Sequence, residues 1–165
     1  MPQSKIDVLR QAFPDMEQDD LKALANVANQ RNYSSDEVLC CEGDIGDTLY
    51  VIVSGQAEVT KQLDDEESTV LNRPGPGDFV GEIALVQETT RTATVRTVAP
   101  TTVLEINRED FVEMLHQSAP MAVRVMLTIS PRLREIDQSL IAYLRQKNTK
   151  LTQDYQELQQ KIRSS

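Results

Sequence analysis

The chain has 165 residues and a net charge of -9, and 39% of its residues are hydrophobic. This length suggests one domain with an appendage and is sufficient to bury a core. So acidic a chain repels a phosphate polymer, which argues against direct contact with nucleic acid. No apolar run approaches the ~20 residues that span a bilayer, and the N-terminus has no apolar secretory segment, so we expect a cytoplasmic protein that does not contact the membrane.

Residues 5–30 show the spacing of amphipathic helices, with apolar side chains at intervals of three and four. Pro14 and Asp15 interrupt this spacing. We therefore expect two short helices within an N-terminal region that covers residues 1–34.

Short β-rich runs separated by turn residues occupy the chain from Val38 to Ile106. They are EVLCC, TLYVIV, QAEVTKQL, STVLN, TATVRTV and TTVLEI. All six glycines lie between Gly43 and Gly81, as in a compact and tightly turned unit. The spacers are too short for crossover helices, so we expect an antiparallel sheet over residues 35–107. The continuous apolar run at residues 49–53 predicts a strand that is covered on both faces.

Helices are predicted for the rest of the chain. Asn107 can N-cap a helix over REDFVEMLHQS, in which Asp110 takes the third position. Pro120 opens a further helix, and Pro131 is expected to interrupt or kink it. We thus assign residues 108–130 to C-terminal helices of the domain and residues 131–165 to one long polar helix.

The long helix carries a narrow apolar seam in heptad spacing. Its positions are Leu144, Asn148, Leu151, Tyr155, Leu158 and Ile162, and Leu133, Ile136 and Leu140 lie on a seam offset by one residue. An asparagine at an a position often fixes the register of a parallel dimer, so we expect a homodimer through a coiled coil. The alternative is a helix that folds back on its own domain.

Other candidate sites are weak. Cys40 and Cys41 are adjacent, which does not match a zinc site, and we expect one buried and one surface thiol, both reduced. His116 lies in a polar helical stretch, and the acidic run at residues 64–67 predicts a solvated hairpin loop. No nucleophile has an evident base partner, so we expect no catalytic activity, no metal site and no resident cofactor.

The stretch GDFVGEIALVQETTRTATV, residues 77–95, carries the chemistry. Gly81 opens a short helical turn whose unpaired backbone amides attract anions. Glu82 places a carboxylate in that turn, and Arg91 follows at the end of the loop, where a guanidinium can fork onto a phosphate. A carboxylate and an arginine on one short loop suit a sugar phosphate, which presents both hydroxyl and phosphate groups.

At these residues the sequence resembles the cyclic-nucleotide-binding domain family, which includes the catabolite activator protein and the regulatory subunits of protein kinase A. The phosphate-binding cassette of that family looks like G-E-[LI]-A-L, a short loop and R-[AST]-A, which here is GEIAL at 81–85 and RTA at 91–93. EGDIGDTLYVIVSG at 42–55 and PGDFVGE at 76–82 resemble two further signatures of the family. The resemblance covers roughly residues 10–145, although Thr90 stands where many members carry proline.

The resemblance implies an α+β fold, in which helices flank an antiparallel, jelly-roll-like β-roll. It also implies a site for cGMP or cAMP. Glu82 would accept a hydrogen bond from the ribose 2′-hydroxyl, and Arg91 would pair with the cyclic phosphate. Amides around Ile83, Ala84 and Thr92 would complete the phosphate cradle. The alternative is that Glu82 and Arg91 form a salt bridge that merely closes the turn.

We expect the site to prefer guanine over adenine, and two residues are the basis for this expectation. Thr92 resembles the threonine that bonds the guanine amino group in cGMP-dependent kinases, and Asp137 can accept from the N1–H and N2–H₂ of guanine. The alternatives are that Asp137 faces solvent and that Thr92 serves cAMP equally well.

The function we expect is that of a regulatory sensor that relays binding through its C-terminal helix to an effector. The chain ends at Ser165 without a helix-turn-helix, so we expect either a stand-alone receiver or the sensory part of a longer protein. The alternative is a structural dimerisation module with a pocket that no longer binds nucleotide.

Overall fold

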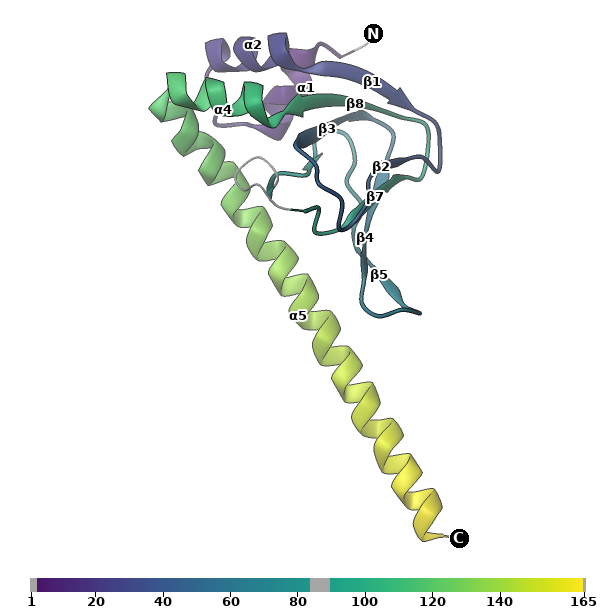
Figure 1. Ribbon diagram of the computed structural model, residues 1–165. Coiled ribbons are helices and arrows are strands. Elements are labelled where there is room, and N and C mark those ends of the chain that lie inside the picture. The colour runs from purple at the N-terminus through teal and green to yellow at the C-terminus, as the bar shows by residue number, and fades with distance from the viewer. Residues whose placement is uncertain (1–2, 84–89, 165) are drawn as a thin grey trace. The chain divides into compact units, whose positions relative to one another are not determined.

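The computed structural model describes residues 3–83 and 90–164 of the chain (Figure 1). The chain divides into two compact units, Met1–Ile129 and Ser130–Ser165. The first unit contains α1 (Lys5–Ala12), α2 (Gln18–Val27), all the strands, α4 (Arg108–Gln117) and the first turns of α5 (Ala119–Arg163). The second unit consists of the remaining turns of α5.

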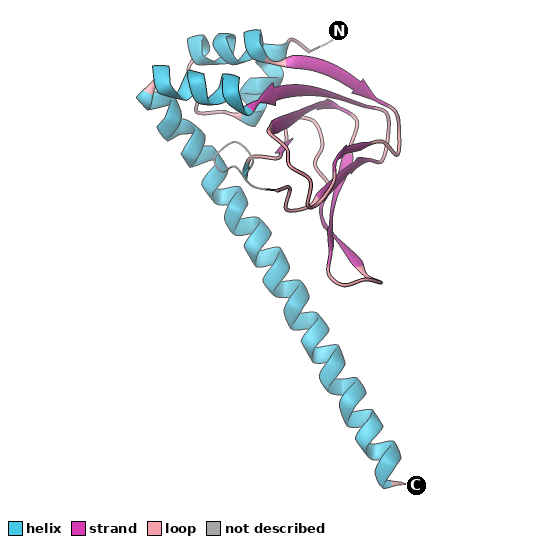
Figure 2. Ribbon diagram, in the orientation of Figure 1, coloured by secondary structure: helices cyan, strands magenta, loops and turns pink. Residues whose placement is uncertain are grey.

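Two antiparallel sheets form the centre of the first unit (Figure 2). In the described residues one sheet has the order β1-β8-β3-β6 and the other the order β2-β7-β4-β5. The strands are β1 (Asn29–Tyr33), β2 (Val38–Cys40), β3 (Thr48–Ser54), β4 (Ala57–Gln62), β5 (Ser68–Asn72), β6 (Phe79–Val80), β7 (Thr94–Thr97) and β8 (Thr101–Asn107). Every strand pair is antiparallel, so the predicted α+β class with an antiparallel β-roll and flanking helices is confirmed.

β3 is covered on both faces, as its continuous apolar run predicted. Leu49 and Val51 point into the core that the helices share with the first sheet. Tyr50 and Ile52 point into a second core, between the sheets. Because successive side chains of a strand alternate in direction, one strand supplies both cores and fixes the two sheets to each other.

The two predicted N-terminal helices are present, and they pack on the first sheet. Ser4 caps α1 by accepting a hydrogen bond from the amide of Asp7. Phe13 then stacks on Phe79 of β6 with ring centroids 5.2 Å apart. Burying two aromatic rings in parallel contact stabilises the helix–sheet interface by more than their buried area alone, by about 0.5–1.5 kcal/mol.

α4 begins where the sequence predicted. The side chain of Asn107 accepts from the amide of Asp110 at 2.9 Å, so this residue is the N-cap. The hydrogen bond pairs one of the amides that a helix N-terminus otherwise leaves unpaired. Phe111, in the next turn, is fully buried.

Two strands escaped the sequence analysis. β1 reads NQRNY and is almost wholly exposed, so it has no apolar alternation, and its residues were assigned to the N-terminal helical region. Its backbone pairs with β8 along five residues, and the hydroxyl of Tyr33 donates to Glu105 at 2.5 Å. β6 has only two residues, which is too short for periodicity to reveal.

Pro131 lies inside α5 rather than between two helices, so the helix is not interrupted there, and a kink at Pro131 stays a prediction. Proline removes one backbone donor and costs about 3 kcal/mol in a helix interior, yet the turns on both sides remain helical. No helix in the described part of the chain combines the length and the apolar character that crossing a membrane requires.

The β4–β5 hairpin carries the acidic run. Its loop is exposed, as predicted, and the carboxylate of Asp64 accepts from the amides of Glu66 and Glu67. The two cysteines are free, with Cys40 half-buried and Cys41 exposed.

Candidate functional site

The backbone of Arg91 is docked onto the glycine-rich loop between β2 and β3. Its amide donates to the carbonyl of Asp44 at 2.8 Å, and its carbonyl accepts from the amide of Gly43 at 2.9 Å. The neighbouring residue, Thr90, forms an antiparallel bridge with Ile45. Two segments of the sequence that are almost fifty residues apart thus meet at Arg91.

The guanidinium of Arg91 is buried, with only 7% of the residue exposed. Nη2 donates to the carbonyl of Thr48 at 2.8 Å, and Cζ lies 5.7 Å from the centre of the Tyr50 ring. Nε and Nη1 are buried and have no hydrogen-bond partner among the residues that the structure describes. Buried donors without partners are costly, and their cost falls when an acceptor, above all an anionic one, binds them.

Two glycines make room for this guanidinium. A Cβ on Gly46 would lie 2.2 Å from Nε of Arg91, and a Cβ on Gly81 would lie 2.6 Å from Nη1. Gly81 also has a φ of +87°, a left-handed conformation that residues with a Cβ rarely adopt. The sequence predicted that Gly81 opens the turn, but it gave no sign that Gly46 contacts the arginine.

Glu82 follows Gly81 directly and is buried, with 7% exposed. Gly81 lies against the guanidinium of Arg91, so the turn that carries Glu82 begins beside it. That Glu82 and Arg91 share one ligand stays a prediction. Ile83 is half-buried in the same turn. Ala84, the remaining predicted cradle residue of this turn, lies outside the described residues.

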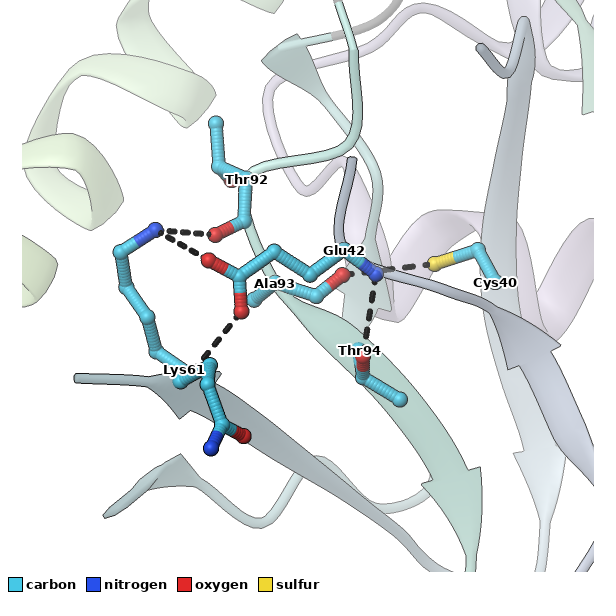
Figure 3. Close-up of polar contacts among 7 residues, drawn as sticks. Cys40, Glu42, Lys61, Thr92, Ala93 and Thr94 are labelled. Atoms are coloured by element: carbon cyan, nitrogen blue, oxygen red, sulfur yellow. Dashed lines mark hydrogen bonds and ion pairs between the residues drawn. The ribbon is translucent and has the colours of Figure 1, made fainter. Parts of the chain in front are cut away.

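Thr92 is exposed, directly after the buried Arg91. Its carbonyl accepts from the ammonium of Lys61 on β4 at 2.7 Å (Figure 3). The same ammonium forms an ion pair with Glu42 at 2.9 Å, and the other oxygen of Glu42 accepts from the amide of Gln62 at 2.8 Å. Lys61 was not singled out from the sequence, and Glu42 was quoted only as the first residue of a family signature.

The charge of Arg91 influences two neighbouring groups. Burial raises the pKa of the Tyr50 hydroxyl, and the positive charge of Arg91 offsets part of that rise. Burial likewise raises the pKa of the Cys40 thiol, against the same positive charge. Both groups are therefore uncharged at neutral pH, so neither neutralises the guanidinium.

Asp137 belongs to the second unit, where its side chain is exposed. His116 lies in the last turn of α4, which ends at Gln117. Within the described residues, the site of the first unit thus consists of one buried cation with two donors that lack a partner there, a buried carboxylate and two glycines that leave space for the cation. Chemically, this arrangement can bind a small anion that also offers a hydroxyl group.

Comparison with known proteins places this geometry in a family. A family model described as the cyclic nucleotide-binding domain matches residues 30–118, which is more than half of the chain. The cGMP-dependent protein kinase of Caenorhabditis elegans is 37% identical over 108 residues, which are 62% of this chain and 14% of the kinase.

Solved structures agree with this match. The catabolite activator protein of Thermus thermophilus superposes with a TM-score of 0.71 at 25% identity, over 81% of this chain and 62% of that one. The regulatory domain of Toxoplasma gondii PKA, crystallised with cAMP, gives 0.62 at 30% identity, over 67% and 43%. This chain spans less than two thirds of each of these three proteins. It belongs to the cyclic nucleotide-binding domain family.

Proposed function

We propose that this chain is a regulatory sensor that binds a cyclic nucleotide, with Arg91 as the partner of the cyclic phosphate. The observation that carries the proposal is the pair of buried donors, Nε and Nη1, that lack an acceptor within the described residues. A phosphate oxygen would accept from both in a forked arrangement, which is the geometry that favours arginine over lysine at phosphates.

The remaining contacts follow from the turn that begins at Gly81. The carboxylate of Glu82 accepts from the ribose 2′-hydroxyl, and the amides of Ile83 and Thr92 contribute to the phosphate cradle. The burial of Glu82 supports this role, because a hydrogen bond inside a dry site discriminates more strongly than one in water. Its position beside Gly81, which contacts the guanidinium, supports a shared ligand.

For the base we propose guanine, with Thr92 and Asp137 as the residues that recognise it. Thr92 is exposed next to the phosphate arginine, which leaves its hydroxyl accessible to a ligand. The matched C. elegans kinase is named as cGMP-dependent, which supports the same choice. Asp137 is proposed on chemistry alone, because a carboxylate can accept from both donors of the guanine edge.

We further propose that binding is relayed through α5 to an effector outside this chain, and that the chain forms a homodimer. The second unit supports the dimer, since the apolar residues of its seam are exposed: Leu144, Leu151, Tyr155, Leu158 and Ile162 are each more than half exposed. An exposed apolar stripe in heptad spacing is the surface that a coiled coil covers. Amide exchange in residues 120–145, with and without nucleotide, tests the relay, and equal protection in both states would contradict it.

The central experiment is a calorimetric titration of the full chain with cAMP and with cGMP, repeated with Arg91→Lys. Binding by the unmodified protein that the lysine variant lacks would support the assignment of the site. Lysine keeps the positive charge but lacks the paired donors with which a guanidinium binds two phosphate oxygens. It is therefore a sharper control than removal of the side chain. If neither nucleotide binds the unmodified protein, the chain is instead a structural dimerisation module with an inactive pocket.

A further inference from the structure

Three segments of the chain converge on the ammonium of Lys61 (Figure 3). Lys61 lies on β4 and donates to Glu42, which follows β2, and to the carbonyl of Thr92, which precedes β7. Glu42 is itself fixed at two further points, since its carboxylate accepts from the amide of Gln62 and its own amide donates to the hydroxyl of Thr94 at 2.9 Å. We call Glu42 and Lys61 the brace.

The brace acts on the residue beside the phosphate arginine. The carbonyl of Arg91 accepts from the amide of Gly43, which fixes the peptide plane before Thr92. The bond from Lys61 to the carbonyl of Thr92 fixes the plane after it. Because a peptide unit is planar, holding both planes sets the backbone angles of Thr92, and with them the directions of its amide and its side chain.

The ion pair is placed where it can hold its geometry. The side chains of Lys61 and Glu42 are 33% and 26% exposed, so both are partly shielded from water. Burial alone would raise the pKa of the Glu42 carboxyl, but the hydrogen bonds from Gln62 and Lys61 outweigh it and lower the pKa. The carboxylate is therefore charged at neutral pH and holds the ammonium on the carbonyl of Thr92.

We infer that Glu42 and Lys61 are positioning residues for nucleotide binding, which hold Thr92 in the orientation that presents its amide and hydroxyl to the ligand. This inference rests on the proposed function. It assigns no ligand contact to Lys61, whose ammonium already serves two acceptors, and it predicts that the two members of the brace act as one unit.

The test compares full-length variants by calorimetric titration with cGMP and cAMP. Lys61→Met keeps most of the length of the side chain but removes its charge and donors, and Glu42→Gln keeps the shape of the carboxylate without its charge. Each should weaken binding about tenfold, as expected when a charge-assisted hydrogen bond is lost, and the double variant should lose little more than either single one. Lys61→Arg, which restores charge and donors, should recover most of the affinity.

The sign of the Glu42→Gln effect separates positioning from direct contact. If Lys61 bound the phosphate itself, removing the competing carboxylate would free the ammonium and strengthen binding, and that result would overturn the inference. The matched control is Arg73→Gln, which breaks the ion pair of Arg73 with Glu58 of β4, also 2.9 Å long, without contact to Thr92. It should leave both affinities unchanged.

A spectroscopic readout shows whether the effect passes through Thr92. The carbonyl ¹³C shift of Thr92 in the nucleotide-free protein should move upfield in Lys61→Met and Glu42→Gln but not in Arg73→Gln. Normal binding by Lys61→Met, or an unmoved shift, would refute the brace while leaving the proposed function intact. Absence of binding by the unmodified protein would instead reject the proposed function, and the inference with it.

Discussion

Arg91 and Gly46 are in direct contact, and the contact leaves no room for any side chain on the glycine: a Cβ there would lie 2.2 Å from Nε of Arg91. Gly46 lies in the loop between β2 and β3, far from the cassette in the sequence. The space around the guanidinium is thus a joint property of two loops, and this dependence can be tested without altering any residue that the proposal places on the ligand.

Gly46→Ala should weaken cyclic-nucleotide binding by about tenfold or more, because the added methyl group displaces the guanidinium from its position, and each 1.4 kcal/mol corresponds to a factor of ten. Overpacking of this kind also costs about 1–3 kcal/mol of unfolding free energy. Titration calorimetry and urea unfolding measure the two effects. The matched control is Gly75→Ala, since a Cβ on Gly75 meets nothing within 4 Å. Equal affinities in the two variants would refute the steric argument.

Replacing Arg91 by methionine should separate binding from stability. The side chain of Arg91 donates one hydrogen bond, to the carbonyl of Thr48, and carries two buried donors without partners in the described structure. Methionine removes the unpaired donors and fills similar space, so the thermal midpoint of the nucleotide-free protein should not fall. Nucleotide binding should be lost, because the phosphate then has no charged partner. The binding free energy should become less favourable by about 2–5 kcal/mol. A variant that unfolds at a clearly lower temperature would show that Arg91 is structural.

Much of this fold could be predicted because its signals are local. The six β-rich runs, the N-cap at Asn107 and the break at Pro14 each depend on a few adjacent residues, and each corresponds to a strand or to a helix boundary of the structure. β1 could not be found in this way. Its side chains are polar and mostly exposed, and it is a strand because its backbone pairs with β8, about seventy residues further along the chain.

The residues of the site likewise fall into those that local sequence predicted and those that it did not. Gly81, Glu82 and Arg91 were predicted from one contiguous stretch, and the structure brings Gly81 against the guanidinium. Gly46, Thr48 and Lys61 were missed as neighbours of Arg91 and Thr92, because each contact joins segments that are far apart in the sequence. The glycine-rich signature at residues 42–55 already contained two of the missed contacts, but nothing in its spacing states which side chain fills the space beside a glycine.

The apolar seam of the second unit should make the protein dimeric. Leu151 and Leu158 are more than half exposed in the single chain, and a coiled coil would cover them. Sedimentation of the full chain should give a dimer at micromolar concentration, whereas a truncation after Tyr143 should give a monomer. Leu151→Asn, in the full chain, serves as a second variant that keeps the helix length. Monomers in both the full and the truncated protein would contradict the prediction.

Acid should weaken binding through the brace. Hydrogen bonds from Gln62 and Lys61 outweigh the effect of burial and hold the folded-state pKa of Glu42 below its ordinary value of 4.5. A carboxyl with a lowered folded pKa contributes stability that is fully present above the unfolded pKa and is lost as the pH falls through the folded one. Affinity and unfolding free energy should therefore both decrease below pH 4.5 more steeply than in Glu42→Gln. Parallel curves for the two proteins would show that Glu42 has no part in the acid response.

Guanine should be preferred over adenine, and the two residues proposed for this choice should contribute separately. Thr92 offers a hydroxyl beside the phosphate arginine, and the carboxylate of Asp137 can accept from two neighbouring donors of guanine, whereas adenine presents a lone pair at the corresponding ring nitrogen. Competitive titration of cGMP against cAMP should thus show tighter cGMP binding, and Thr92→Ala and Asp137→Ala should each reduce the ratio. Adenine gains nothing from either side chain in this scheme, so the affinity for cAMP should change little in both variants. Tighter binding of cAMP by the unmodified protein would overturn the guanine assignment, while the role of Arg91 at the phosphate, which both nucleotides share, would stand.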